Sequence, residues 1–198
     1  MSTSQDHTEG HQEPLPIDLT NQFLMAMPGM LGGPFAGTVV YVCEHSGKGA
    51  LGLVINRPTD LTLASLLEKI DLKLDSPDSL DAPVYFGGPV QTDRGFVLHQ
   101  PAGNYSSSLA LANMALTTSR DVLEAVAEGK GPDKILVTLG YAGWGAGQLE
   151  DELAQNAWLT VEANPDILFE TPAEERYPAA MRLLGIDPAM LASDPGHA

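Results

Sequence analysis

Cys43 and His45 stand two residues apart in the run TVVYVCEHS, which reads as a β-strand. A strand places such residues on the same face, and a thiol beside an imidazole is the arrangement of a cysteine nucleophile with its base. On a regular strand their Cβ atoms lie about 6–7 Å apart, so a direct hydrogen bond would require a bulge at Glu44. The alternative, which we favour, is a cysteine packed as a small hydrophobic residue. We therefore expect Cys43 to be buried, slow to react and not catalytic.

A metal site is the second chemistry to consider, with Glu44, His45 and His99 as the candidate ligands. These residues are scattered over separate predicted strands, and no H-x-x-x-H pair falls on a predicted helix. His7 and His11 have a four-residue spacing but lie in a polar segment with no helical pattern. The sequence therefore predicts no metal and no cofactor.

The serines Ser106–Ser108 lack the surrounding G-x-S-x-G pattern of a serine hydrolase, so we predict no catalytic residue there or elsewhere.

Four glycines follow the apolar run Ile135–Leu139 within eight residues, from Gly140 to Gly147. We expect a strand, a glycine-rich turn and then a helix. Free N–H groups in such a turn can bind an anion. The spacing is not G-x-G-x-x-G, however, and three acidic residues at 150–152 would repel a phosphate. The alternative is a compact turn whose glycines let Trp144 fold against the sheet.

Basic residues are scarce, which draws attention to Arg57 and Arg94, each at the end of a strand or in a turn. Each arginine either pairs with a nearby carboxylate or binds a small anion near the glycine turn. We expect Trp144 to be partly buried, with one ring edge exposed and one of these arginines beside it in a shallow groove. The candidate ligand or partner contact site comprises Asn56, Arg57, Arg94, Gly143, Trp144, Gly145 and Gly147.

Composition limits the class of protein. The net charge is −16, with only 10 Lys and Arg, which opposes direct binding to nucleic acid or to an anionic membrane. The single cysteine excludes an internal disulfide and favours a reducing cytoplasm. No apolar run reaches the roughly 18 residues of a membrane-spanning helix, and the N-terminus lacks the pattern of a signal peptide. These features predict a cytoplasmic location.

Hydrophobic patterns and turn residues predict the elements that must position these side chains. The predicted strands are Phe23–Met27, Thr38–Cys43, Ala50–Ile55, Pro83–Phe86, Gly95–Gln100, one or two edge strands within Leu109–Leu116, Ile135–Leu139 and Trp158–Val161. Predicted helices begin near Thr62, at a Thr118 or Ser119 cap, at Gln148, at Pro165 and at a capping box formed by Thr171 and Glu174. Pro178 is expected to kink or restart the last of these helices. Residues 1–18 are predicted to be a disordered tail, residues 19–192 a single domain and residues 193–198 a frayed end.

Four runs, in this order, carry a family resemblance: GTVVYVCEHS, GALGLVINRP, VYFGGPVQTDRGFVLH and LGYAGWGAGQLEDELAQNAWL. Together they resemble the YqgE/AlgH family of bacterial proteins, over roughly Leu19 to Leu184. The resemblance implies an α+β fold whose mixed, bifurcated β-sheet forms a pseudo-barrel with peripheral helices. By the family's name, it also implies a regulatory role in the control of alginate production, without an established biochemical activity.

Two hypotheses about function follow. The first is a non-enzymatic regulatory or protein-interaction protein that affects transcription only indirectly, through a protein partner. The alternative is a small-anion-binding sensor or enzyme that uses the glycine-rich segment 140–147.

Overall fold

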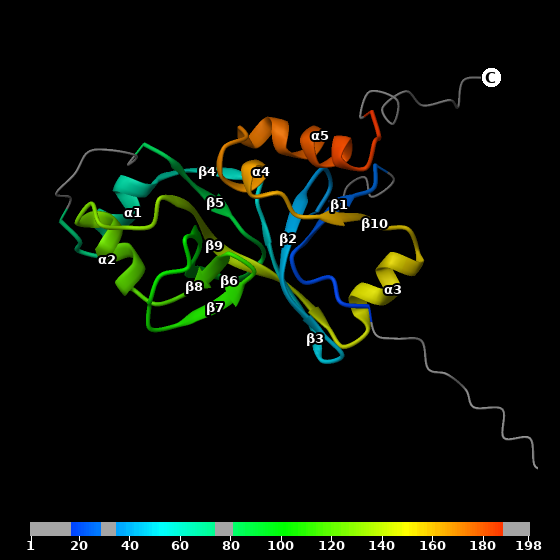
Figure 1. Cartoon of the computed structure of the whole chain (residues 1–198), viewed down its shortest axis with the longest axis horizontal. Coiled ribbons are helices and arrows are strands. Elements are labelled where there is room, and N and C mark those ends of the chain that lie inside the picture. Colours follow the sequence, from blue (N-terminus) through cyan, green and yellow to red (C-terminus); the bar gives the residue numbers. More distant parts are fainter. Residues whose placement is uncertain (1–16, 29–34, 74–80, 188–198) are drawn as a thin grey trace, which may run out of the picture.

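A computed structural model describes residues 17–28, 35–73 and 81–187 of the chain (Figure 1). The described strands are β1 (Gln22–Ala26), β2 (Val39–Ser46), β3 (Gly49–Val54), β4 (Pro58–Thr62), β5 (Pro83–Phe86), β6 (Val90–Gln100), β7 (Ser108–Leu111), β8 (Met114–Thr117), β9 (Lys134–Gly145) and β10 (Trp158–Glu162). The described helices are α1 (Leu63–Lys69), α2 (Asp121–Ala127), α3 (Gln148–Ala154), α4 (Pro165–Phe169) and α5 (Ala173–Leu183). None of these helices is long and apolar enough to cross a membrane.

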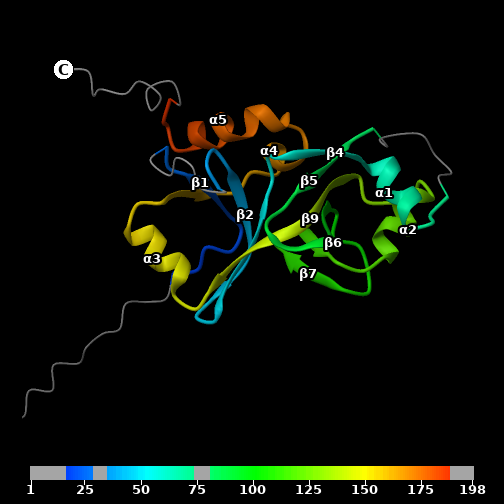
Figure 2. The same ribbon diagram turned by 180° about the vertical axis from the view of Figure 1, so that it is seen from behind.

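Strand β9 joins the two halves of the sheet, whose order is β10-β1-β2-β3-β9-β6-β8-β7. The first part of β9 pairs antiparallel with β6 and, at Thr138 and Leu139, parallel with β5. Its last residues, 142–145, pair with β3 instead. The sheet therefore splits along β9, with β4 and β5 branching from the main path. This confirms the predicted α+β class and the mixed, bifurcated sheet, which curls into a half-barrel with helices packed against it (Figure 2).

The split depends on glycines that allow two backbones to touch. Gly140 lies inside β9 with φ +78°, and a Cβ there would overlap the carbonyl oxygen of Gly88. A Cβ on Gly87 would in turn overlap the carbonyl oxygen of Gly140. The link between β5 and β6 therefore crosses β9 without side chains between them.

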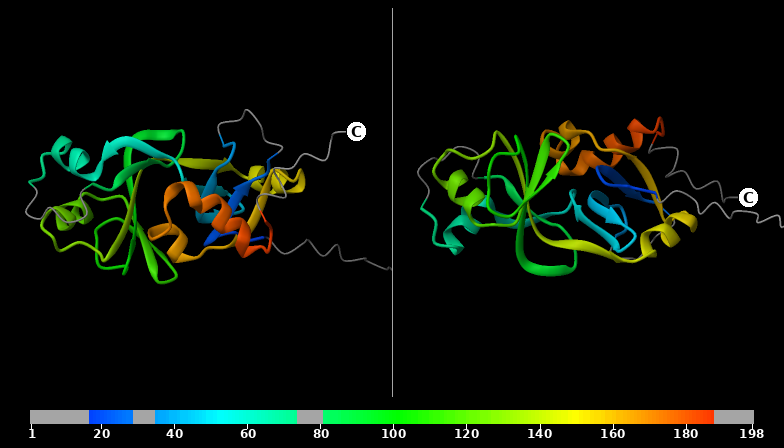
Figure 3. Two further views of the ribbon diagram at one scale, coloured as in Figure 1. Left: turned by 90° about the horizontal axis from the view of Figure 1, so that it is seen from above. Right: turned by 60° about the horizontal axis from the view of Figure 1, so that its bottom comes forward.

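Three apolar clusters fill the fold. On one face of β1 and β2, Phe23, Met25 and Tyr41 pack under α4 and α5. On the other face, Val40 and Val42 pack with Trp158 and with Leu149 of α3. The third cluster joins α1 and α2 to β5, β6 and β9 through residues such as Leu67, Val122 and Val137. Figure 3 shows α1 and α2 at the end of the molecule opposite α3.

Several predicted details were wrong. Gly140, Gly143 and Gly145 lie within β9, and only Gly147 (φ +76°) lies in a turn, because the strand runs on to pair with β3. The α2 cap is Arg120, without a side-chain hydrogen bond.

The predicted capping box of α5 does not form either. Pro172 precedes the helix, and the Thr171 hydroxyl donates to the carbonyl of Asp166 instead. Strand β4 is absent from the predicted strands; it begins at Pro58, and proline is tolerated as the first residue of a strand.

The predicted start of a helix at Pro165 is confirmed, and Asn164 caps this helix, α4, through its side chain. Asn156, just after α3, has φ +58°. The predicted tails, residues 1–18 and 193–198, lie outside the described residues except for Ile17 and Asp18, and the domain limits stay a prediction.

Candidate functional site

The hairpin of β2 and β3 carries the chemically interesting side chains. The register between the strands shifts between Val42, opposite Gly52, and Glu44, opposite Leu51, so Cys43 is an extra residue in a bulge. Cys43 enters the cluster under α4 and α5, whereas His45 faces α3 on the other side. The bulge considered in the sequence analysis therefore exists, but it separates the thiol from the imidazole.

Cys43 is 1% exposed, and its thiol donates weakly to the carbonyl oxygen of Tyr41 over 3.8 Å. The pKa of this thiol is raised far above its ordinary value, mainly by burial and to a smaller extent by the negative charge of Glu44. Because the thiolate is the reactive form, nothing here activates the sulfur.

Alkylation of Cys43 at neutral pH should therefore be at least about a hundredfold slower in the native protein than in urea-unfolded protein. Ellman's reagent or iodoacetamide labelling, followed by mass spectrometry, measures both rates. Stoichiometric labelling of the folded protein within seconds would contradict this prediction and favour a redox role.

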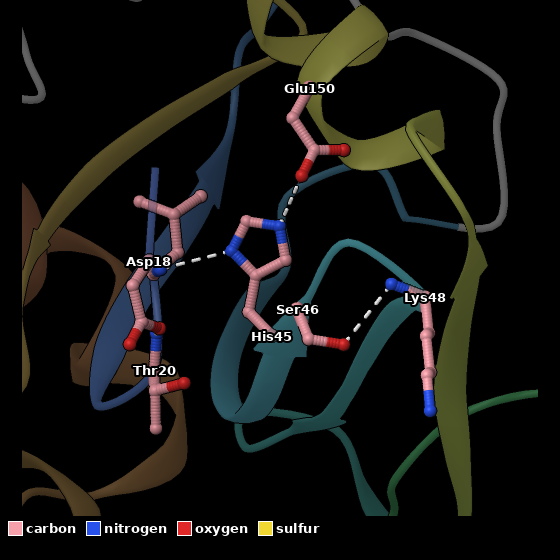
Figure 4. A network of polar contacts seen from close by, with 7 residues as sticks. Asp18, Thr20, His45, Ser46, Lys48 and Glu150 are labelled. Carbon is pink, nitrogen blue, oxygen red and sulfur yellow. Dashed lines mark hydrogen bonds and ion pairs between the residues drawn. The ribbon is translucent and has the colours of Figure 1, made fainter. Parts of the chain in front are cut away.

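His45 is held by two hydrogen bonds (Figure 4). Its Nδ1 accepts from the main-chain N–H of Leu19 over 3.0 Å, so the proton of the neutral ring is on Nε2. Nε2 lies 2.5 Å from Oε1 of Glu150, the third residue of α3. The imidazole side chain is 1% exposed and the carboxylate side chain 36%.

This arrangement resembles part of a catalytic dyad but cannot act as one. A general base needs a free lone pair, and the lone pair on Nδ1 is used by Leu19. A hollow of about 490 Å³ adjoins the pair, lined by residues that include Asp18, Ser46 and Gly147. The pair instead ties the chain entering β1 to the hairpin and to α3.

The pKa of the Glu150 carboxyl is lowered, and the largest cause is a hydrogen bond from the N–H of its own residue in the first turn of α3. Partial burial raises this pKa, and the hydrogen bond to His45 lowers it further. A lowered carboxyl pKa adds stability above the ordinary value of 4.5, and this stability is lost as the pH falls through the folded value. The free energy of unfolding should therefore fall more steeply below about pH 4.5 in the wild type than in Glu150→Gln. Urea melts between about pH 3 and 7 measure it. Parallel curves for the two proteins would show that the carboxylate contributes nothing.

A groove of about 450 Å³ lies on the opposite side of the hairpin. Its walls are Glu44, Ser46, Lys48, Gly49, Ala50, Leu51, Val90, Tyr141, Gly143 and Trp144. Leu51 and Tyr141 also border the large cluster under α4 and α5, so the groove is an exposed extension of the core.

The structure separates the predicted contact residues. Gly143 and Trp144 line the groove, but neither Arg57 nor Arg94 is among its wall residues. The Arg57 side chain donates to the carbonyl of Ala36, and Arg94 lies over the Phe96 ring at 5.9 Å. Asn56 accepts from the Val39 N–H and donates to Gly37, which ties the end of β3 to the start of β2.

Trp144 is more buried than expected, at 6% exposed. Its ring stacks on Phe35 and meets Trp158 edge-on, with centroids 6.3 and 6.1 Å away. Gly145 donates its N–H to Oε1 of Gln148, and Gly147 precedes α3. These placements do not test whether the predicted residues contact a ligand or partner, so that role stays a prediction.

No group of three or more His, Cys, Asp or Glu that could hold a metal occurs among the described residues. His99, a candidate ligand, lies in the other half of the sheet, where its Nδ1–H donates to the Pro101 carbonyl and its Nε2 accepts from Thr117. It is fully buried and remote from His45, so the two imidazoles do not form one site.

The fold and this hairpin define an α+β protein with a sheet split along one long strand. The chain belongs to the AlgH-like family, whose profile matches residues 23–189. A UPF0301 protein of Bordetella avium is 71% identical over 181 residues, which cover 91% of this chain and 92% of the relative. A UPF0301 protein of Cupriavidus metallidurans is 65% identical over 184 residues, 92% of this chain and 97% of the relative.

Two solved structures are similar. The solution structure of the AlgH protein from Pseudomonas aeruginosa superposes with a TM-score of 0.76 at 52% identity, covering 94% of this chain and 100% of that one. The crystal structure of a Corynebacterium diphtheriae protein superposes with a TM-score of 0.65 at 20% identity, covering 86% and 87%, and shares the fold. The family assignment made from the four sequence runs is thus confirmed, and the family is one of uncharacterised function.

Proposed function

We propose that this protein acts by binding a protein partner rather than by catalysis, as a cytoplasmic regulatory protein, and that the groove beside the β2–β3 hairpin is the contact surface. The observation that carries the proposal is a strand edge at this groove. Residues 142–145 of β9 pair with β3 on one side, and no other described strand pairs with them.

The orientation of this edge follows from alternation along an antiparallel strand. The Gly145 N–H donates to the Gln148 side chain and so points away from β3. The N–H and C=O of Gly143, two residues earlier, then point the same way, toward the groove. Gly143 is exposed and has no side chain to block an incoming strand.

The groove fits an extended segment of a partner protein that adds a strand to this edge. Leu51, Val90 and Tyr141 are half-buried and supply an apolar floor for alternate side chains of the segment. The net charge of −16 and the exposed Glu44 favour a segment that carries basic residues. The same net charge opposes direct contact with DNA, so an effect on transcription would pass through the partner.

The chemistry of the hairpin also supports binding over catalysis. The thiol of Cys43 is buried, and both ring nitrogens of His45 are engaged in hydrogen bonds. Neither can meet a substrate without breaking a contact of the native fold.

The test compares proteins captured by cross-linking in cells that express the wild type or single variants. Val90→Glu and Leu51→Glu place a charge on the groove floor and should reduce capture of the same partner by about tenfold or more. Leu109→Glu is the matched control, because Leu109 is 39% exposed on β7, outside the groove. Urea melts establish that the variants fold.

Equal capture by the groove variants and the control would contradict the proposed surface. So would a captured partner that a competing basic, extended peptide from its own sequence fails to displace.

A further inference from the structure

Arg176, on α5, is a buried cation away from the hairpin, only 5% exposed. Its Nε donates to the Thr171 carbonyl over 2.9 Å, and its Nη1 donates to the Ile55 carbonyl. The guanidinium lies over the Tyr85 ring at 4.7 Å. Main-chain carbonyls and an aromatic ring therefore hold it in one orientation.

None of these partners carries a negative charge. Among the described residues, no carboxylate lies within ion-pair distance of Arg176, and Glu174 acts on it only from farther away. Burial, the largest influence, lowers the pKa of the guanidinium, although the group stays charged. A buried charge without a counter-charge is costly, so an anion that reached it would be bound strongly.

A cavity leads to this cation. A hollow of about 110 Å³ includes Arg176 and Tyr85 in its walls, and a hollow of about 390 Å³ opens beside it. The two share the wall residues Leu63, Ala82, Ile135 and Phe169. They lie between α1, α4 and the start of β9.

The walls change in character along the cavity. Near Arg176 they are Leu136, Val137, Leu168 and Phe169, which are apolar. The wider part reaches Gly131, Asp133 and Lys134, and Lys134 pairs with Glu170 over 2.6 Å. The wider hollow, about 390 Å³, is within the range of about 300–1,000 Å³ that small-molecule sites occupy.

We propose that this cavity binds a small carboxylic acid with an unbranched apolar body. The carboxylate lies against Arg176 at the narrow end, and the hydrocarbon body lies along Leu63, Ile135 and Phe169. A guanidinium suits a carboxylate because its planar N–H donors match the two oxygens. A phosphate, with its larger charge and polar surface, suits these apolar walls less well.

The acidic net charge does not oppose this site. Exposed charges are screened over about 8–10 Å at physiological ionic strength. Arg176 lies in the low-dielectric interior, where its attraction for a carboxylate is much less screened. Arg176 should therefore attract a carboxylate in this cavity despite the negative net charge of the chain.

The experiment titrates the full chain with octanoate, and with octanol and octylamine as probes of equal length. Binding is measured by calorimetry and by the shifts of main-chain NMR signals. Octanoate should bind at least about tenfold more tightly than octanol, and octylamine should not bind. The largest shifts should fall on Ile135, Phe169 and Arg176.

Two variants locate the site. Ala82→Phe places a ring in the cavity while keeping the Arg176 side chain, and should weaken octanoate binding by about tenfold or more. Arg176→Gln should make octanoate bind no better than octanol, whereas Arg120→Gln, at an exposed ion pair with Glu124, should change nothing. If Arg176→Gln does not fold, the comparison of octanoate with octanol and the Ala82→Phe variant still decide the question.

Equal affinity for octanoate and octanol would overturn the role of Arg176. Octanoate binding that survives Ala82→Phe, or NMR shifts confined to the β2–β3 hairpin, would overturn the location. Absence of octanoate binding at millimolar concentration would overturn the proposal as a whole.

Discussion

Replacing Gly140 with alanine should lower the free energy of unfolding by about 2–6 kcal/mol. A residue with a side chain held in this conformation costs about 1–3 kcal/mol, because φ is +78°. Overpacking adds a further 1–3 kcal/mol or so, since the new methyl group would overlap the Gly88 carbonyl oxygen and press on that of Val90, 3.1 Å away. A loss of this size is a large part of the 5–15 kcal/mol that typically stabilises a domain.

Gly147 provides a matched control. Its φ is +76°, nearly that of Gly140, but nothing lies within 4 Å of the position of a Cβ. Gly147→Ala should therefore cost only the conformational part, about 1–3 kcal/mol. The difference between the two variants in urea melts measures the packing at the crossing itself.

If the two variants lose equal stability, the contact between β9 and the β5–β6 link contributes nothing, and the sheet is not held together at Gly140. A larger loss for Gly147→Ala than for Gly140→Ala would point to the turn before α3 as the constrained element.

The local elements could be predicted because their signals are local. Runs such as Val39–Cys43 and Trp158–Val161 are apolar and β-branched or aromatic, and Asn164 with Pro165 begins a helix by a mechanism confined to neighbours. A glycine does not by itself indicate a strand, a helix or a turn. Gly140, Gly143 and Gly145 fit a turn as well as a strand that is crossed closely, and only the pairing with β3 and β6 distinguishes the two.

The candidate site was harder to predict for the same reason. A bulge of one residue at Cys43 places Cys43 and His45 on opposite faces of the strand. The residues Val42–His45 contain no sequence signal for such a bulge. Glu150 lies 105 residues from His45, and the other partner is the main chain of Leu19, so neither contact leaves a motif. Arg176 gave no signal either, because a charged residue in an amphipathic helix is usually exposed.

Replacing Trp144 with alanine should destabilise the protein by about 3–5 kcal/mol, the usual cost of removing a large aromatic ring from a core. The ring is 6% exposed, stacks on Phe35 and meets Trp158 edge-on. Gly52, on β3, leaves room for it, since a Cβ there would lie 3.3 Å from the ring. Trp144→Phe should lose clearly less, because it keeps an aromatic ring in the same space.

Urea melts followed by the fluorescence of Trp158 measure both Trp144 variants, since Trp158 is the other of the 2 tryptophans in the chain. A loss within about 0.5 kcal/mol for Trp144→Ala, as for an ordinary surface change, would contradict the buried position and return the residue to the contact surface. A large loss assigns the ring to the core behind the groove. The Leu51 and Val90 variants then test partner binding separately, because these two side chains border the groove while the Trp144 ring packs in the cluster with Trp158.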